Sequence, residues 1–81
     1  MNNKNVVVYS KDNCKHCMMV KNWLEGNGTE FTEINVLAEG NEKHLQQVED
    51  WGFQGLPVTK IDDHEPFDKF QPELLDAYIN K

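Results

Sequence analysis

The sequence has no arginine, only two cysteines and no long apolar run among its 81 residues. Arginine binds phosphates and carboxylates through paired hydrogen bonds, so its absence argues against bidentate phosphate recognition. The 14 acidic residues outnumber the 8 lysines and give a net charge of −6. Because phosphate groups repel a negative chain, nonspecific nucleic-acid binding and an anionic membrane surface are both disfavoured as the main partner.

No apolar run approaches the ~18 residues needed to span a bilayer, and the polar residues Met1–Asn5 contain no apolar segment of a secretory signal. We therefore expect a soluble, cytoplasmic protein with no membrane partner. A chain of 81 residues suits one domain with a small core, so a single domain over residues 1–81 is expected. No feature of the sequence indicates a stable oligomer, and we expect a monomer.

The two cysteines, Cys14 and Cys17, lie three positions apart in a polar stretch that follows an apolar segment. In a reducing cytosol such a C-x-x-C pair is more often catalytic or metal-binding than a permanent cross-link. A disulfide between them would close a ring of only four residues, so it would remove little entropy from the unfolded chain. The pair is therefore interpreted as chemically active.

The apolar pattern predicts alternating strands and helices. Residues 5–10 contain three valines and a tyrosine, the composition of a buried strand. In residues 31–36 apolar and polar side chains alternate, which predicts a strand with Phe31 on one face and Ile34 and Val36 on the other. The predicted order is β-α-β-α-β-β-α: strand 5–10, helix 15–26, strand 31–36, helix 42–51, strand 58–61, edge strand 65–67 and a last helix that starts at 71–73.

The helix over residues 15–26 is expected to place the two cysteines differently. Cys17 shares one face with the apolar residues of this helix, which predicts that it points inward and leaves Cys14 at the exposed tip. Asp12 or Asn13 is expected to cap the helix, because both side chains can accept hydrogen bonds from its free N–H groups.

Cys14 is the expected nucleophile, because the free N–H groups and the dipole of a helix N-terminus favour a thiolate. The positive charges of Lys11 and Lys15, and hydrogen bonds from helix N–H groups including that of Cys17, are expected to lower the pKa of Cys14 further. Cys17 would then attack Cys14 and resolve a mixed disulfide.

Three stretches carry a resemblance to a known family. They are Val8–Cys17 with the C-x-x-C pair, Gly52–Val58 with its Leu-Pro-Val, and Phe67–Glu73. In this order and at this separation they resemble the thioredoxin fold, and within it the glutaredoxins and above all the NrdH-redoxins, the small electron donors of class Ib ribonucleotide reductase. The resemblance covers nearly the whole chain. It implies an α/β fold with a four-stranded mixed sheet and three helices.

The resemblance also implies a function. The protein would be a thiol–disulfide oxidoreductase without a cofactor that donates electrons from a dithiol to ribonucleotide reductase and is reduced by thioredoxin reductase. It implies a cis Leu56–Pro57 bond that aims the Leu56 backbone at a substrate, which pairs as an added strand. His16 would either tune charge and redox potential or face solvent. The catalytic residues would be Cys14 and Cys17, and the residues expected to contact substrate or partner are Lys11, Lys15, His16, Leu56, Pro57 and Phe67.

The third stretch departs from the family pattern. NrdH-redoxins usually have Trp-Ser-Gly-Phe-Arg-Pro where this chain has Phe67-Asp-Lys-Phe-Gln-Pro72. We expect Phe67 to rim an apolar patch where the C-terminal tail of a partner docks, and Phe70 to pack in the core. Glutaredoxins that bind glutathione usually have two glycines and an acidic residue near this place. The four acidic residues here are interpreted as a solvated face close to the site: Asp62, Asp63, Glu65 and Asp68.

Three alternative functions stay open. A glutathione-dependent glutaredoxin shares the fold and the nucleophile, but the glycine pair that lets its backbone approach the tripeptide is missing. In a zinc-binding module, Cys14 and Cys17 would supply half of a site, and histidines would have to complete it, although His44 and His64 are expected to be surface residues. An interaction module with idle cysteines is the third alternative.

Overall fold

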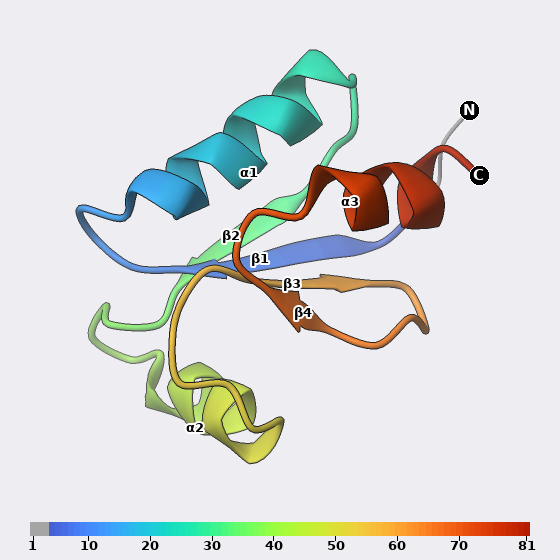
Figure 1. Ribbon diagram of the computed structural model, residues 1–81. Helices are drawn as coiled ribbons and strands as arrows, with labels where there is room; N and C mark the ends of the chain where they lie inside the picture. The colour runs from blue at the N-terminus through green and yellow to red at the C-terminus, as the bar shows by residue number, and fades with distance from the viewer. Residues whose placement is uncertain (1–3) are drawn as a thin grey trace.

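The computed structural model describes residues 4–81, in which four strands and three helices follow each other in the predicted order (Figure 1). The elements are β1 (Val6–Ser10), α1 (Lys15–Gly26), β2 (Thr32–Asn35), α2 (Glu42–Asp50), β3 (Val58–Ile61), β4 (Phe67–Asp68) and α3 (Pro72–Ile79). Pro72 occupies the first turn of α3, where its missing N–H is not needed.

The four strands form one mixed sheet in the order β2-β1-β3-β4. Strand β1 pairs in parallel with β2 and antiparallel with β3, and β3 pairs antiparallel with β4. The central position of β1 explains its continuous apolar sequence, because helices cover both of its faces. The sheet and helices are those that the resemblance implied.

Helices α1 and α3 cover one face of the sheet and α2 covers the other (Figure 1). Successive side chains of a strand point to opposite faces. Val6 and Val8 therefore pack under α1 and α3, whereas Tyr9 packs on the α2 side. On β2 and its flanks Phe31 joins the first cluster while Ile34 and Val36 join the second, which confirms the predicted alternation.

The β3–β4 hairpin differs from the prediction. Strand β4 comprises Phe67–Asp68 rather than residues 65–67, and Pro66 precedes the strand instead of lying in it. The turn between the two strands is therefore longer than expected, and two hydrogen bonds within it hold it closed. The His64 N–H donates to the Ile61 carbonyl oxygen at 2.9 Å, and the Lys60 ammonium donates to the His64 carbonyl oxygen at 2.7 Å.

The acidic residues of this turn do not lie close to the cysteines, contrary to the prediction. Asp62, Asp63 and Glu65 follow the far end of β3 (Figure 1). They are separated from Pro57 by four strand residues, or about 13 Å of extended chain. Asp68 alone stays at the near end, where it pairs with Val58. The three distant carboxylates therefore form a solvated turn away from the site.

Among residues 4–81, no helix has the length and apolar character required to cross a membrane.

Thr59 provides a test of the core. Its side chain is fully buried between Val8 and Phe67 on neighbouring strands, and within the described chain its hydroxyl has no hydrogen-bond partner. We expect Thr59→Val to raise the free energy of unfolding by about 1 kcal/mol, because valine has nearly the same shape and removes the unsatisfied group. Chemical denaturation measures this change.

The matched control is Thr32→Val, since Thr32 is exposed on β2. This control should change the free energy of unfolding by less than about 0.5 kcal/mol. A loss of stability in Thr59→Val would contradict the prediction.

Candidate active site

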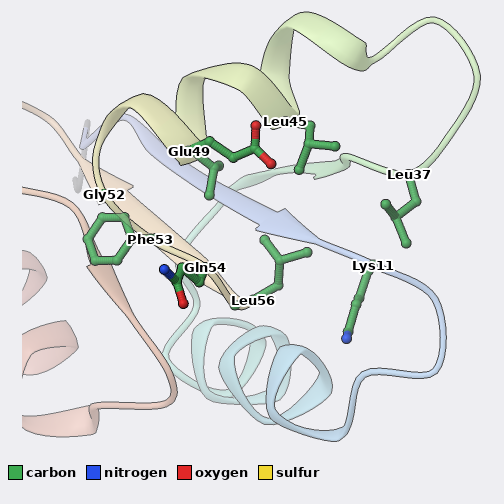
Figure 2. Close-up of a pocket in the computed structure, with 10 residues that line it drawn as sticks. Lys11, Leu37, Leu45, Glu49, Gly52, Phe53, Gln54 and Leu56 are labelled. Carbon is green, nitrogen blue, oxygen red and sulfur yellow. The ribbon is translucent and has the colours of Figure 1, made fainter.

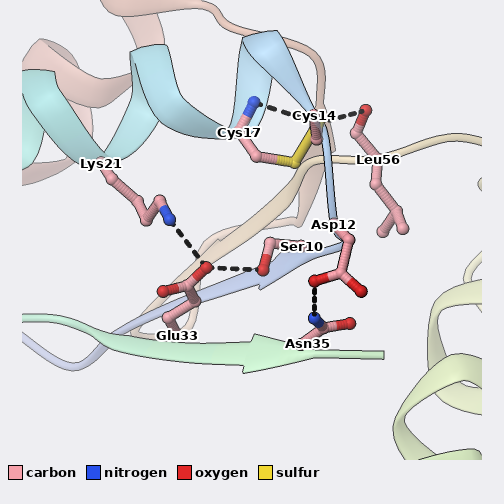
Figure 3. The surroundings of a disulfide bond; sticks show 8 residues. All are labelled: Ser10, Asp12, Cys14, Cys17, Lys21, Glu33, Asn35 and Leu56. Atoms are coloured by element: carbon pink, nitrogen blue, oxygen red, sulfur yellow. Dashed lines mark hydrogen bonds and ion pairs between the residues drawn. A yellow bond between two sulfur atoms is a disulfide. The ribbon is translucent and has the colours of Figure 1, made fainter. Parts of the chain in front are cut away.

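The C-x-x-C pair lies where β1 passes into α1. Cys14 and Cys17 form a disulfide, with their Cα atoms 5.2 Å apart (Figure 3). Residues three positions apart on a helix lie on the same side, and this separation is within the usual range for disulfides. The geometry of the first turn of α1 is therefore sufficient to bring the two sulfurs within bonding distance.

Cys14 is the N-cap residue of α1. Its backbone is extended, with φ −109° and ψ 108°, and its sulfur accepts a hydrogen bond from the Cys17 N–H at 3.1 Å. The Cys14 carbonyl oxygen accepts from the Met18 N–H at 3.2 Å. The predicted hydrogen bond from Cys17 is therefore confirmed, and a helix N–H group points at the reactive atom.

The predicted cap by Asp12 or Asn13 is wrong. The Asp12 carboxylate accepts a hydrogen bond from the Asn35 side-chain amide at 2.9 Å and so ties the turn to β2. Asn13 lies in the left-handed region with φ 55°, a conformation that asparagine tolerates in turns. The chain turns at these two residues, the helix begins at Lys15 as predicted, and the Cys14 sulfur is its cap.

The two cysteines differ less in exposure than predicted. Cys14 is 8% exposed and Cys17 is 1% exposed, so Cys17 is the inner residue but Cys14 does not form an exposed tip. The disulfide turns the Cys14 sulfur toward Cys17, and the Leu56 carbonyl oxygen lies 3.8 Å from it. The side chains of Lys11, Lys15 and His16 are exposed around the pair.

The Leu56–Pro57 peptide bond is cis, as the resemblance implied. It places the Leu56 carbonyl oxygen beside the Cys14 sulfur (Figure 3). A disulfide sulfur has no proton to donate, so this is a contact in the oxidised protein and becomes a possible hydrogen bond only after reduction. The Pro57 carbonyl oxygen accepts from the Lys69 N–H at 3.0 Å, which joins this loop to the segment after β4.

Phe67 does not rim a surface patch, contrary to the prediction. It is 6% exposed and belongs to the core cluster under α1 and α3, with its ring edge-to-face against Tyr78 at 6.0 Å. Strand β4 points this side chain inward because it is paired with Thr59, whose side chain lies on the same face. Phe70 packs against the same cluster, as expected. Lys69, where NrdH-redoxins have glycine, adopts the left-handed backbone that glycine favours, with φ 64°.

A polar network that the sequence analysis missed lies between α1 and the sheet, below the disulfide (Figure 3). The buried Ser10 hydroxyl donates to the Glu33 carboxylate at 2.8 Å, and the Lys21 ammonium donates to the same oxygen at 2.9 Å. The hydrogen bond from Lys21, and then that from Ser10, hold the pKa of Glu33 below its ordinary value. The predicted alternation of residues 31–36 already placed Glu33 on the face of Phe31.

Tyr9 lies on the other face of the sheet, immediately before Ser10. Its ring packs edge-to-face against Trp51 at 5.6 Å and lies 6.2 Å from the His44 ring. Burial raises the pKa of Tyr9. His44, which was expected at the surface, is half-buried beside the Tyr9 ring.

Apart from His16, which lies between them in the sequence, the histidines do not converge with the cysteines. His44 lies on α2, and His64 lies in the β3–β4 turn, where it stacks on Tyr78 at 4.0 Å. Within residues 4–81, no group of three or more His, Cys, Asp or Glu side chains is arranged to hold a metal ion. The zinc alternative therefore has no ligand set in this part of the chain.

A pocket with a volume of about 560 Å³ opens between α2 and the loop before β3 (Figure 2). Leu56 lines it, and the carbonyl oxygen of Leu56 lies 3.8 Å from the Cys14 sulfur. We call this pocket the α2 pocket. It is lined mainly by the apolar Leu37, Leu45, Phe53 and Leu56 and by the charged Lys11 and Glu49. No local sequence pattern predicts this pocket, because its walls come from three separate segments.

The Glu33 network gives a prediction about pH. Because the pKa of Glu33 is lower in the folded chain, its contribution to stability is present above the unfolded value of about 4.3 and is lost as the pH falls through the folded value. We expect Glu33→Gln to lower the free energy of unfolding at pH 7 by about 0.2–1 kcal/mol, since Glu33 is partly exposed. Urea denaturation should show that the difference from wild type shrinks as the pH falls below about 4.3.

The exposed Glu30 provides the control, and Glu30→Gln should show a smaller difference at pH 7. Equal effects of the two substitutions at pH 7, or a Glu33→Gln effect that stays constant as the pH falls below about 4.3, would contradict the assigned network.

Comparisons with known proteins agree with this geometry. A family model described as Glutaredoxin matches residues 6–65. The glutaredoxin-like protein NrdH of Lactococcus lactis subsp. cremoris (strain MG1363) is 40% identical over 70 residues, which cover 86% of this chain and 93% of that protein. The Gene 56 protein of Mycobacterium phage L5 is 32% identical over 75 residues, covering 93% of this chain and 72% of that protein.

A solved structure gives the same assignment. The glutaredoxin-like protein NrdH-redoxin from Escherichia coli, described as having a thioredoxin-like activity profile, matches with a TM-score of 0.82 and 25% identity, covering 90% of this chain and 92% of that chain. The fold is thus thioredoxin-like. With its C-x-x-C pair at the start of α1, the chain belongs to the glutaredoxin family, is similar to its NrdH-type members and is a thiol–disulfide oxidoreductase.

Proposed function

We propose that the protein is a dithiol electron carrier in which Cys14 is the attacking thiolate and Cys17 the resolving thiol. The observation that carries this assignment is the hydrogen bond from the Cys17 N–H to the Cys14 sulfur at 3.1 Å. A helix N–H group aimed at a sulfur stabilises negative charge on it, and so favours the thiolate of Cys14. The Leu56 carbonyl oxygen, 3.8 Å from the Cys14 sulfur, disfavours the thiolate, because its partial charge is negative.

The reaction takes two exchange steps. The Cys14 thiolate attacks one sulfur of the substrate disulfide, which breaks that bond, forms a mixed disulfide and releases the other substrate sulfur as a thiolate. Cys17 then loses its proton and attacks the Cys14 sulfur. This step releases the second substrate thiol and closes the internal disulfide, so two electrons pass from the protein to the substrate.

The surroundings of the cysteines support roles for the remaining predicted site residues. Lys11, Lys15 and His16 are exposed beside Cys14. The ammonium groups of the two lysines favour a thiolate there and attract anionic partners. Leu56 presents its backbone toward the sulfur, and Pro57 is buried behind it. An extended substrate segment paired with Leu56 would bring its disulfide to Cys14.

The proposed electron acceptor is ribonucleotide reductase, and the proposed reductant is thioredoxin reductase. Support comes from the 40% identity to an NrdH protein and from the thioredoxin-like activity profile described for the E. coli NrdH-redoxin. The proposal includes a monomeric, cytoplasmic carrier formed by a single domain over residues 1–81. The glycine pair that glutathione-binding glutaredoxins usually have near this place is missing, which makes a glutathione groove the weaker alternative.

Substitution of each cysteine tests the assigned roles. We expect Cys14→Ser to abolish reduction of a protein disulfide such as that of insulin, because the nucleophile is lost. Cys17→Ser should instead stop at the first step and accumulate a mixed disulfide with the substrate, visible by mass spectrometry. Retained dithiol turnover in Cys14→Ser would show that Cys14 is not the nucleophile.

The reductant can be identified by a paired assay. We expect NADPH with thioredoxin reductase to re-reduce the Cys14–Cys17 disulfide at a rate at least about tenfold above that with glutathione and glutathione reductase, since the glycine pair that accommodates the tripeptide is missing. NADPH consumption at 340 nm, with the protein limiting, measures both rates. Faster turnover with glutathione would assign the protein to the glutathione-dependent class.

A further inference from the structure

A pair of asparagine side chains joins the C-terminal ends of α1 and α3, which lie on the same face of the sheet (Figure 1). The Asn27 side-chain amide donates to the Asn80 side-chain oxygen, and the Asn80 amide donates to the Asn27 side-chain oxygen, each at 3.1 Å. The Asn27 amide nitrogen also donates to the Thr29 hydroxyl at 2.6 Å. Three hydrogen bonds therefore hold the Asn27 side chain in place, although both asparagines are exposed.

The residue after Asn27 is a glycine that the end of α1 requires. Asn27 is the C-cap residue, and Gly28 has a left-handed backbone with φ 73°. The Gly28 N–H donates to the Glu25 carbonyl oxygen at 3.1 Å. The Thr29 N–H donates to the Leu24 carbonyl oxygen at 3.0 Å, which completes a Schellman motif. Any other residue at position 28 would be strained, because this backbone conformation favours glycine.

An asparagine followed by glycine is chemically labile. The backbone nitrogen of Gly28 attacks the side-chain carbonyl carbon of Asn27, and glycine has no side chain to hinder the approach. The bond between the Gly28 nitrogen and Asn27 Cγ forms, the Cγ–Nδ2 bond breaks, and the departing ammonia takes the Gly28 amide proton. Water then opens the cyclic imide at one of its two carbonyls, which leaves aspartate or isoaspartate at position 27.

The folded chain opposes this attack at both reacting groups. The Gly28 N–H is engaged by the Glu25 carbonyl oxygen, so the nucleophile is directed back along α1. The carbon to be attacked belongs to the amide that Asn80 and Thr29 hold. Cyclisation therefore requires local opening. Asn80 is the C-cap of α3, and exposed hydrogen bonds at helix ends open at a small cost in free energy.

The product of the reaction does not restore the contact. A carboxylate accepts hydrogen bonds but donates none, so the bonds to the Asn80 side-chain oxygen and the Thr29 hydroxyl are lost. The new negative charge also lies at the C-terminal end of α1, where the helix dipole disfavours it. Asp76, which accepts from the Asn80 amide at 2.9 Å, brings a second carboxylate close.

We propose that Asn27 is a spontaneous deamidation site that the folded chain protects through Asn80, and that its modification permanently releases the end of α3 from α1. The rate of modification then follows how often this part of the molecule opens. The site lies at the opposite end of α1 from Cys14 and Cys17, so the inference is independent of the thiol chemistry.

Peptide mapping tests the site. The native protein is kept at mildly alkaline pH, samples are digested with trypsin, and liquid chromatography with mass spectrometry separates the aspartate and isoaspartate forms. The peptide of residues 22–43 also contains Asn22, Asn35 and Asn41, none of which precedes a glycine. We expect Asn27 to be modified before these three internal controls. Earlier modification of any of them would show that Asn27 is not the labile site.

The substitution Asn80→Ala tests the protection. We expect it to raise the rate of Asn27 deamidation in the native protein about fivefold, because it removes two of the three hydrogen bonds that hold the amide. The matched control is Lys81→Ala, since Lys81 is the exposed next residue and pairs with Asp76 at 3.7 Å. This control should change the rate by less than about twofold.

An unfolded reference shows that folding is the cause of the protection. In guanidinium chloride, wild type and Asn80→Ala should deamidate at one common rate, at least about tenfold above that of the native wild type, because unfolding opens the site in both. Equal rates in native and unfolded wild type would overturn the protection. So would an unchanged native rate in Asn80→Ala, or an equal rise in Lys81→Ala.

The substitution Asn27→Asp reproduces one product and tests the release. We expect it to lower the midpoint of chemical denaturation, because a carboxylate replaces the amide donor at the end of α1. The matched control is Asn22→Asp, which adds the same charge at an exposed position of α1 away from Asn80, and it should lower the midpoint less. An Asn27→Asp midpoint equal to or above that of wild type would refute the release.

Discussion

The proposed chemistry of this protein depends on one hydrogen bond, from the Cys17 N–H to the Cys14 sulfur. The first N–H groups of a helix need an acceptor outside the helix, and a thiolate needs donors. At the start of α1 one sulfur meets both needs, because Cys14 is the cap residue. A side-chain oxygen at position 14 would also accept the hydrogen bond from the helix N–H, but the protein would then lack the proposed sulfur nucleophile.

Side chains from β2 hold this arrangement in place. Asn35 engages Asp12, which removes a competing cap from the helix, and Glu33 binds Ser10 and Lys21 beneath the disulfide. The parallel pairing of β1 and β2 brings these polar groups to the end of the sheet where α1 begins. On the other side, the α2 pocket is lined by apolar side chains together with Lys11 and Glu49.

The sequence alone determined the element order, the faces of the strands and the identity of the reactive pair. These features depend on local patterns. The alternation in residues 31–36 set the faces of Phe31 and Ile34, and the C-x-x-C spacing placed two sulfurs on one helical turn. The N–H donor to Cys14 was also predictable, because every helix start exposes such groups. The cis Leu56–Pro57 bond followed from family resemblance rather than from the residues themselves.

Only the tertiary structure decided which residues surround that pair. Phe67 became a core residue because pairing of β4 with β3 turned it inward, and the carboxylates of the β3–β4 turn were carried to the far end of a strand. The cap of α1 is Cys14 rather than Asp12 or Asn13, and Asp12 instead accepts a hydrogen bond from Asn35, 23 positions away in the chain. The walls of the α2 pocket likewise come from three separate segments of the chain. Such contacts depend on strand pairing across long loops, and no local pattern in the sequence encodes them.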